Sequence, residues 1–376
     1  MTVLVEHELV AASRRWAALK LAPELTGAED RFPAAAWRSS AEQGVLGLCV
    51  PEEYGGLAAG ALRAAEVMAA IGEETMRNDL LFAMSAHMWA CQQPLVRFGT
   101  AEQKQRYLPS LVSGEVIGAH AASELDAGSD VMAIGTTASR AAGGWVLDGS
   151  KTLITNAPVA GLFLVLTRTA PGSGFAGLSA FLVPRDTPGL CVAPAMGKLG
   201  LDGSPMSGLT LTRCEVPDDA CLGGPGAGFA VLSHTMTYER ALILAPAVGV
   251  MAGALRNALE YARSRHQFGR PIGAFDAVRR RIVRMRLALE TSRDMLFKSA
   301  RALDDGTLTG AEASLTKLHV SESYNVFAGE LLDVFGGHGF LERTGVEHIL
   351  RDAVGSRSYS GTSDIQIRVI AESMGL

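Results

Sequence analysis

The feature that most limits the fold is the order of local patterns along the chain, which run helical, then β, then helical. Residues 1–115 are alanine-rich, and the stretch 62–71 spaces its apolar residues at i, i+3 and i+4, as amphipathic helices do. Residues 116–222 consist of short strand-like runs separated by Gly and Pro, and residues 223–376 return to helical spacing. We therefore predict a mainly α protein with an N-terminal helical domain, a middle β domain and a C-terminal helical bundle.

The strand signal in the β block is clearest around residues 145–155. Asp148-Gly149 separates two apolar runs there and favours a type I′ turn, so we predict a β-hairpin. Further strands are expected at 162–166, 180–183 and 208–212. Recurring Gly and Pro between them are typical of a small barrel or sandwich. The run Gly223–Gly228 lacks GxGxxG spacing and a βαβ context, which indicates a linker.

Composition excludes several classes of protein. Of 376 residues, 48% are hydrophobic and 19% charged, which argues against disorder, and the net charge of -5 argues against nucleic-acid binding. The five cysteines form no CxxC pair, so we expect neither a disulfide framework nor a metal site. The N-terminus lacks a signal-like pattern, and the apolar run 241–255 is too short to span a bilayer. We expect a soluble cytoplasmic protein without membrane partners.

Four segments carry residues suited to chemistry. The loop 123–130 is either an ordinary turn or a loop whose hydroxyls and N–H groups hold a polar ring edge. In 237–245 an apolar helix contains Glu239 and Arg240, which form a structural ion pair or include a carboxylate whose pKa burial raises toward the range of a general base. Adjacent helix residues do not face each other, so each needs its own partner.

Two further segments break helices. In 263–272, Arg beside Phe suits phosphate binding and ring stacking, or is an ordinary basic helix end. In 333–340, three glycines allow close approach of another group, or simply make a tight turn between helices. The run 314–317 matches a serine–lysine hydrolase motif but lacks its companion motifs, so we discount it.

The segment 359–366 ends the series. Ser363 and Gln366 have capping-box spacing, so we predict that a helix starts there after a glycine loop. A helix N-terminus offers free N–H donors to an oxygen of a ligand. Ser360, directly before Gly361, cannot act as a carboxylate base.

In this order and at these separations, the segments resemble the acyl-CoA dehydrogenase family over nearly the whole chain. The matching segments are 123–130, 238–245, 265–272 with Phe275, 335–340 and 361–366. The resemblance implies a helical domain, a β-barrel and a four-helix bundle, with FAD bound between barrel and bundle and partly by a neighbouring subunit. It places these residues at FAD: Ser123 and Ser129 near the ring, Thr155 against it, Thr362 and Asp364 near the pyrophosphate, Gly336 and Gly337 at the dinucleotide, and Arg265 and Phe268 toward a neighbour's FAD.

The family's chemistry is α,β-desaturation of a thioester, with a carboxylate taking the α-proton. Many members carry this glutamate at the position that is Ser360 here. Other branches place it on a bundle helix, at the position of Glu239, so the resemblance implies that Glu239 is the base and that Arg240 supports the charge. Tyr359, Ser360 and Gly361 then form the loop that holds the substrate carbonyl.

A closer resemblance is to family members that act on carrier-protein thioesters, especially prolyl-carrier-protein dehydrogenases of natural-product and antibiotic biosynthesis. The runs 156–158, 238–240 and 360–364 carry it. It implies a prolyl or other aminoacyl chain on a carrier protein as substrate. An ordinary dehydrogenase for a short or branched acyl-CoA, a flavin oxidase or monooxygenase, and a non-catalytic member with a structural Glu239 remain alternatives.

The resemblance also implies partners. We expect a homo-oligomer, either a dimer or a tetramer, with a flavoprotein or oxygen as electron acceptor. Arginines cluster at 279–281, 284 and 286, where they either dock an acidic carrier protein or form a solvated face. We favour the solvated face because these positions point in several directions around a helix.

Overall fold

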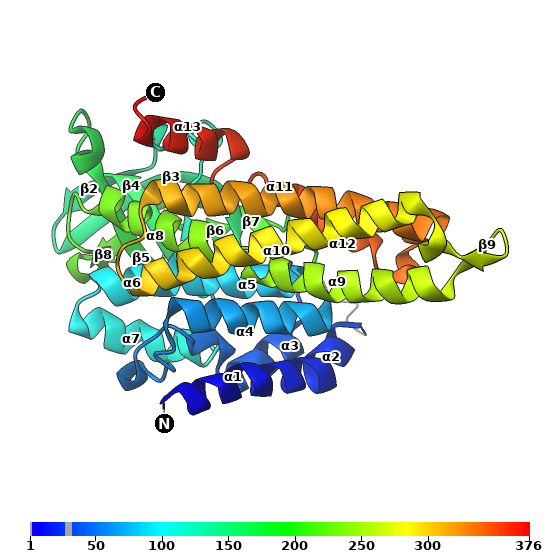
Figure 1. The fold of residues 1–376 in the computed structure, drawn as a ribbon. Helices are drawn as coiled ribbons and strands as arrows, with labels where there is room; N and C mark the ends of the chain where they lie inside the picture. Colours follow the sequence, from blue (N-terminus) through cyan, green and yellow to red (C-terminus); the bar gives the residue numbers. More distant parts are fainter. Residues whose placement is uncertain (1, 27–31) are drawn as a thin grey trace.

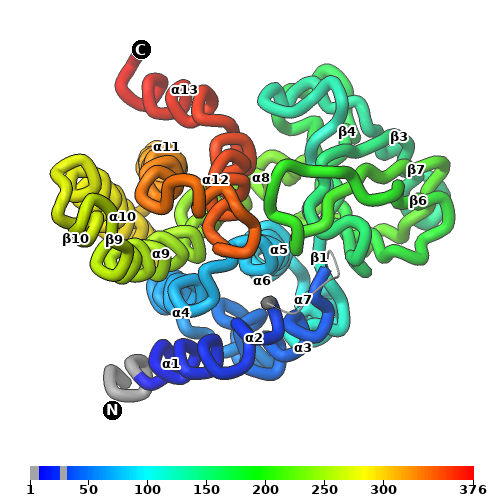
Figure 2. The backbone as a smooth tube through the Cα atoms, turned by 90° about the vertical axis from the view of Figure 1, so that its right-hand side faces the viewer, coloured from blue at the N-terminus to red at the C-terminus, as the bar shows by residue number. Residues whose placement is uncertain are grey.

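The computed structural model describes residues 2–26 and 32–376 and has the three-part architecture that the sequence predicts (Figure 1). The N-terminal part holds α1 (Thr2–Trp16), α2 (Ala22–Thr26), α3 (Ala34–Glu42), α4 (Gly60–Thr75), α5 (Asp79–His87), α6 (Gln93–Phe98) and α7 (Ala101–Val112). The C-terminal part holds α8 (Gly228–Leu242), α9 (Ala245–Ser264), α10 (Asp276–Asp304), α11 (Gly310–Phe335), α12 (Glu347–Gly355) and α13 (Ser363–Ser373). Figure 2 shows strands β3, β4, β6 and β7 on one side, the long C-terminal helices with β9 and β10 on the other, and α5 and α6 between them.

The strands form one eight-stranded sheet and a separate two-stranded hairpin. The sheet contains β1 (Gly118–Ala121), β2 (Thr137–Ala141), β3 (Gly144–Thr155), β4 (Leu162–Arg168), β5 (Leu178–Pro184), β6 (Leu190–Val192), β7 (Met206–Pro217) and β8 (Cys221–Leu222). Its order is β6-β7-β3-β2-β4-β5-β8, and β1 also pairs with β4 in parallel. The strands expected at 162–166, 180–183 and 208–212 are confirmed as parts of β4, β5 and β7.

The hairpin predicted at Asp148-Gly149 is wrong. β3 runs without a turn through this pair, and the hairpin turn lies earlier, between Ala141 of β2 and Gly144 of β3. The pairing of β3 with β7 shifts register between Leu147 and Gly149, so the pair marks a β-bulge. A Cβ on Gly149 would lie 2.6 Å from Oγ1 of Thr136, so glycine is needed for this close approach rather than for a turn.

The long helices pack through small residues where α9 crosses α4. A Cβ added to Gly249 of α9 would lie 1.9 Å from the carbonyl oxygen of Ala69, and one added to Gly253 would lie 2.3 Å from that of Glu73. On the α4 side, a Cβ on Gly72 would lie 2.3 Å from the carbonyl oxygen of Pro246. The backbones of the two helices are therefore nearly in contact.

We expect Gly249→Ala to destabilise the protein by about 1–3 kcal/mol, because the added methyl group must push α9 away from α4. The exposed Gly310, at the start of α11, has no atom within 4 Å of an added Cβ, so Gly310→Ala is the matched control and should be nearly neutral. Urea unfolding of the two variants checks this. Equal stability of the two variants would contradict the close helix contact.

The apolar helices α8 and α9 build the core rather than a membrane anchor. Together they span Gly228–Ser264, a stretch long and apolar enough to cross a bilayer by composition, yet 78% of its apolar window is buried inside the fold. Leu242, Val248 and Met251 are among its fully covered side chains.

The five cysteines are all free.

Candidate active site

Glu239 lies in the last turn of α8, with its side chain buried between α11 and the loop before α13. Only 8% of the residue is exposed. Burial raises the pKa of its carboxyl to about 7, and this effect outweighs a hydrogen bond from the Ser360 side chain and the charges of Arg240 and Lys317, which favour the ionised form. Glu239 is therefore a carboxyl that gains and loses its proton near neutral pH.

The loop 359–362 approaches Glu239 with an unusual backbone. Ser360 has φ +54° and Gly361 has φ +92°, both in the left-handed region. A Cβ on Gly361 would lie 2.7 Å from Nε2 of Gln366, whose flexible side chain would have to move, and the positive φ itself favours glycine here.

Donors from three elements bind the carbonyls of this loop from one side. The Ser360 oxygen accepts from Gln366 Nε2 at 3.0 Å and from Arg240 Nε at 3.4 Å. The Gly361 oxygen accepts from Lys317 Nζ at 2.7 Å and from Gln366 Nε2 at 3.0 Å. The N–H groups of Ser360 and Gly361 have no acceptor among the described residues, so they are available to a ligand oxygen.

Tyr359 connects this loop to the N-terminal domain. Its ring lies 4.4 Å from that of Phe82 in α5, measured between centroids. Its hydroxyl is buried beside the Asn78 side chain, which hydrogen-bonds to it and opposes the rise in pKa that burial causes. Tyr359 therefore packs the loop against the start of α5.

The helix predicted to begin at Ser363 does begin there, but the predicted capping box between Ser363 and Gln366 is wrong. Thr362 is the N-cap, and its hydroxyl accepts from the Ile365 N–H at 3.3 Å. Ser363 instead donates to Glu322 of α11, and Gln366 turns back to the loop carbonyls. Asp364 is exposed in the first turn of α13.

A buried ion pair holds the loop 123–130 against the sheet. Lys151 is fully buried, and its Nζ lies 2.7 Å from Glu124 and donates to the Ala122 carbonyl at 3.0 Å. The Glu124 carboxylate also accepts from the N–H groups of Gly135 and Thr136. Burial lowers the pKa of Lys151 to about 8 although Glu124 opposes this, so the attraction within the pair only partly offsets the removal of the lysine from water.

The predicted cofactor residues of the β domain lie near this ion pair and are at least partly exposed. The Ser123 carbonyl accepts from the Thr152 N–H at 2.9 Å, and Ser129 is exposed. Thr155 is half-buried at the end of β3. Beside them Leu125 and Leu153 are 89% and 58% exposed, so the same surface offers hydroxyls and uncovered apolar groups.

The other predicted cofactor residues lie at the far end of the helical bundle. Arg265 ends α9, and Phe268 is the tip of the hairpin β9 (His266–Gln267) and β10 (Arg270–Pro271), which projects from the molecule (Figure 1). Phe268 is 93% exposed. The rings of Tyr261 and Phe335 stack at 4.3 Å, which ties this end to the exposed glycines 336 and 337.

The structure thus sorts the predicted residues into groups. Glu239, Arg240, Tyr359, Ser360 and Gly361 meet in one place. Ser123, Ser129 and Thr155 lie on the β domain; α5 links them to the first group, because Asn156 donates to the Ala83 carbonyl at 2.9 Å and Phe82 packs on Tyr359. Arg265 and Phe268 belong to the hairpin β9–β10 and its entry, and Gly336 and Gly337 follow α11; the hairpin projects at the end of the molecule opposite the large sheet (Figure 1).

Sequence reasoning missed Lys317 and Gln366, whose side chains hold the loop. Lys317 was read only as part of a discounted motif. A signal was present, because Lys317 lies in line with Ala313, Val320 and Tyr324 on the buried stripe of α11, where a lysine requires a partner.

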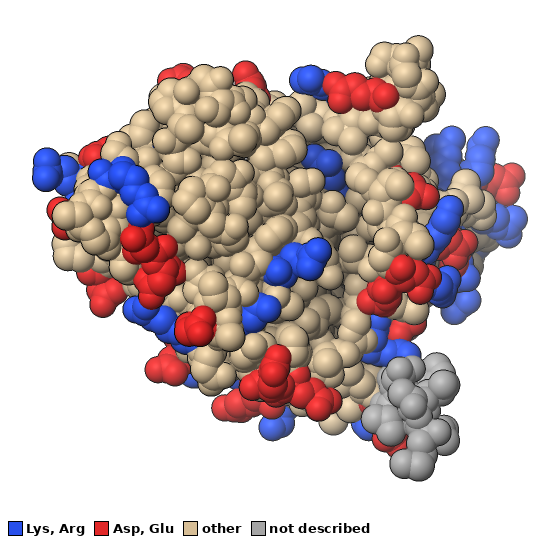
Figure 3. Space-filling view, turned by 90° about the vertical axis from the view of Figure 1, so that its left-hand side faces the viewer, with Lys and Arg blue, Asp and Glu red and all other residues tan. Residues whose placement is uncertain are grey.

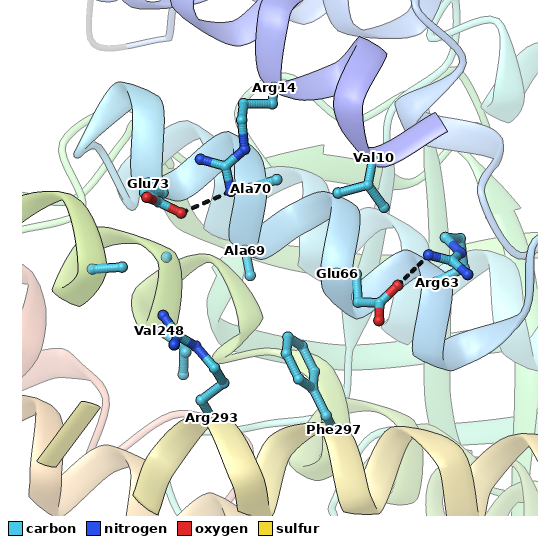
Figure 4. Close-up of a pocket in the computed structure, with 12 residues that line it drawn as sticks. Val10, Arg14, Arg63, Glu66, Ala69, Ala70, Glu73, Val248, Arg293 and Phe297 are labelled. Atoms are coloured by element: carbon cyan, nitrogen blue, oxygen red, sulfur yellow. Dashed lines mark hydrogen bonds and ion pairs between the residues drawn. The ribbon is translucent and has the colours of Figure 1, made fainter. Parts of the chain in front are cut away.

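A cleft of about 400 Å³ lies elsewhere, between α1, α4, α9 and α10 (Figure 4). Its charged side chains are paired, Arg14 with Glu73 across it, Arg63 with Glu66 along α4, and Arg293 with Glu290 along α10. It includes none of the predicted site residues. Among the described residues, no group of three or more His, Cys, Asp or Glu side chains is arranged to hold a metal ion.

This arrangement of helical domain, sheet and bundle around a buried bundle-helix glutamate is that of one enzyme class, and the chain belongs to the acyl-CoA dehydrogenase family. Models of the family's N-terminal, middle and C-terminal domains match residues 5–115, 119–214 and 226–375.

Among curated relatives, the chain is 40% identical to an L-prolyl-[peptidyl-carrier protein] dehydrogenase of Pseudomonas fluorescens, over 92% of this chain and 91% of that protein. It is 36% identical to a mitochondrial isovaleryl-CoA dehydrogenase of Solanum tuberosum, over 90% and 82%. Among solved structures, it matches the prolyl acyl carrier protein oxidase AnaB with TM-score 0.95 and 38% identity, covering 99% of both chains. PigA with FAD and proline matches with TM-score 0.94 and 35% identity, covering 99% and 98%.

Proposed function

We propose that this protein is an FAD-dependent dehydrogenase that desaturates a prolyl group carried as a thioester on a carrier protein. The observation that carries the proposal is the buried Glu239, with a pKa raised to about 7, set against a loop whose N–H groups have no acceptor among the described residues. The similarity to prolyl-carrier-protein dehydrogenases over more than nine-tenths of the chain supports the substrate class.

In this proposal Glu239 takes the proton from the carbon next to the thioester carbonyl. A carboxylate with a pKa near the working pH is both sufficiently ionised and sufficiently basic for this step. As the proton leaves, negative charge builds on the thioester oxygen, and the backbone N–H of Ser360 holds it. Arg240 anchors the Ser360 carbonyl and keeps positive charge near the reacting carboxylate.

The residues present fit FAD on two surfaces. Ser123, Ser129 and Thr155 combine hydroxyls with exposed Leu125 and Leu153, which suits a flat apolar ring with a polar edge. Thr362 and Asp364 lie at the start of α13, which is close to the loop 123–130. The pKa of Arg368 on α13 is raised mainly by its hydrogen bond with Glu372, and the charge of Asp130 in that loop adds to the rise. When bound, FAD supplies the acceptor for the β-hydride.

The remaining cofactor residues would serve a neighbouring subunit. A fully exposed aromatic at the tip of a projecting hairpin normally marks a contact surface. Phe268, with Arg265, Gly336 and Gly337, therefore completes the FAD site of a second copy, which makes the protein a homo-oligomer, of two or four subunits.

We further propose a cytoplasmic enzyme of antibiotic biosynthesis that passes its electrons to a flavoprotein or to oxygen. A docking role for the arginines of α10 gains little support, because four of the five have an acidic partner. Arg279, Arg281, Arg284 and Arg286 pair with Asp276, Glu330, Asp333 and Glu290. On the face shown in Figure 3, basic and acidic side chains are interspersed around a broad uncharged surface.

Anaerobic mixing with matched substrates tests the function. We expect the yellow flavin colour to bleach rapidly with prolyl-carrier protein, and much more slowly with prolyl-CoA or with short and branched acyl-CoA thioesters. Admitting air afterwards separates an oxidase, which recolours at once, from a dehydrogenase that waits for its acceptor. Faster bleaching by an acyl-CoA would identify an ordinary acyl-CoA dehydrogenase and overturn the carrier substrate.

A further inference from the structure

Lys317 is the most unusual charged residue outside the roles already described. It lies in the third turn of α11, and none of its surface is exposed. Its neighbours on the same face are fully buried as well; Val320 and Tyr324 are apolar or aromatic, and Ser314 and Ser321 are small and polar. A lysine in such surroundings is retained only where its ammonium group has strong partners.

The partner of Lys317 is the backbone of the loop that faces Glu239. Its Nζ donates to the Gly361 carbonyl at 2.7 Å and lies 5.9 Å from the centre of the Tyr359 ring. A peptide group is planar and trans, so its C=O and N–H point in opposite directions. Holding the Gly361 carbonyl toward α11 therefore fixes the plane of the peptide that follows it, and Gln366 ties this plane to the preceding one through the Ser360 carbonyl.

The loop needs such anchoring because its backbone is strained. Ser360 is a non-glycine residue with φ +54°, a conformation that persists only when surrounding contacts enforce it. Donors from three elements supply this enforcement: Arg240 from α8, Lys317 from α11 and Gln366 from α13. Of these three residues, only Lys317 carries a charge whose pKa, about 8, lies within the pH range of ordinary experiments.

Three charged side chains, Arg240, Glu322 and Glu239, act on the ammonium group of Lys317. Burial lowers its pKa to about 8, Arg240 lowers it further, and Glu322 and Glu239 raise it. In return, the charge of Lys317 lowers the pKa of Glu239, alongside the Ser360 hydrogen bond and the charge of Arg240. Glu322 itself is held by Ser363 and Arg357.

We propose that Lys317 is a positioning residue that, by holding the Gly361 carbonyl, fixes the loop 360–361 that faces the thioester oxygen, and that its charge favours the ionised form of the Glu239 carboxyl. The statement about the thioester rests on the proposed function. The statement about Glu239 stands without it, because it concerns two groups of the protein alone.

Three variants separate the two effects. Lys317→Met removes the charge and the donor but matches the apolar stripe of α11. Lys317→Gln removes the charge and keeps a donor, and Lys317→Arg keeps both. Lys298→Met, an exposed lysine on α10, is the control for loss of one positive charge at a distance.

The direct readout is the titration of Glu239, followed by infrared difference spectroscopy of the carboxyl C=O stretch and assigned with Glu239→Gln. It needs no substrate. We expect the Glu239 pKa to rise by roughly one unit in Lys317→Met and Lys317→Gln, and to stay in place in Lys317→Arg and Lys298→Met. If Lys317→Met does not fold, the glutamine variant alone decides the result.

The second readout is the bleaching rate with prolyl-carrier protein. At pH 7 we expect a fall of roughly fivefold in Lys317→Gln and a larger fall in Lys317→Met, which also loses the loop anchor. An unchanged Glu239 titration in both variants would overturn the inference. Failure of the wild-type protein to bleach with any thioester would instead overturn the proposed function and leave the titration result valid.

Discussion

Replacing Lys151 with methionine is expected to destabilise the protein by roughly 3 kcal/mol and to release its FAD, because the change leaves a carboxylate without its buried partner. Lys151 is fully buried, and Glu124 is 12% exposed at 2.7 Å from it. The same ammonium group holds the Ala122 carbonyl, so the whole entry of the loop 123–130 depends on it. The loss of FAD follows because Ser123 and Ser129 belong to this loop.

Removing both partners should be much milder than removing one. The pKa of Lys151 is lowered to about 8, so the attraction to Glu124 does not fully offset the cost of burying the ammonium group. The double variant Lys151→Met with Glu124→Gln is therefore expected to recover more than half of the lost stability. Asp218→Asn is the matched control, because it removes an ion pair with Arg140 that is about 60% exposed, and such pairs contribute less than about 1 kcal/mol. Urea unfolding and the flavin absorbance check both effects. Equal losses in Lys151→Met and Asp218→Asn would refute the structural role of the pair.

Glu239→Gln is expected to slow flavin bleaching by about three orders of magnitude at pH 8 while FAD content stays at the wild-type level. Glutamine keeps the size of the side chain but cannot accept the α-proton. Glu290→Gln, a partly exposed glutamate of α10 paired with Arg286, should bleach at the wild-type rate. Rapid anaerobic mixing with prolyl-carrier protein gives both rates, and comparable rates in the two variants would exclude Glu239 as the base.

The same substitution should stabilise the fold. The folded pKa of Glu239, about 7, lies above its ordinary value of 4.5, so the folded protein retains a proton that the unfolded chain releases. Stability from this group therefore falls as pH rises from 4.5 to 7, and above pH 7 Glu239→Gln should be more stable than wild type by about 2–3 kcal/mol. Below pH 4.5 the difference should vanish. Thermal unfolding at pH 8 and pH 4.5 tests the sign.

Much of the fold follows from periodicity. The helical and β blocks differ in hydrophobic spacing, so their order could be read directly, and strands β4 and β5 are continuous apolar runs. The hairpin at Asp148-Gly149 failed for a reason that lies outside the local sequence. Gly149 is needed there because Thr136, the residue before β2, approaches its backbone closely.

The site divides in the same way. Glu239 could be proposed from a carboxylate embedded in an apolar helix, and the geometry places it beside Ser360. The burial of Lys317 could be predicted from its place on the buried stripe of α11, but its partner could not. The role of Gln366 could not be predicted, because it depends on where α13 brings the residue in space. Residues 265, 268, 336 and 337 could be named from the resemblance alone, and the role proposed for them involves a second copy of the chain.

The pH dependence of anaerobic bleaching tests the central claim most directly, with the apparent second-order rate constant measured from pH 5 to pH 8.5. This constant reports ionisations of the free protein. The account predicts a rate that rises with pH through an apparent pKa of about 7 in the wild type, and a slow rate without this step in Glu239→Gln. A rate independent of pH in the wild type, or the same rising limb in Glu239→Gln, would show that another group removes the α-proton.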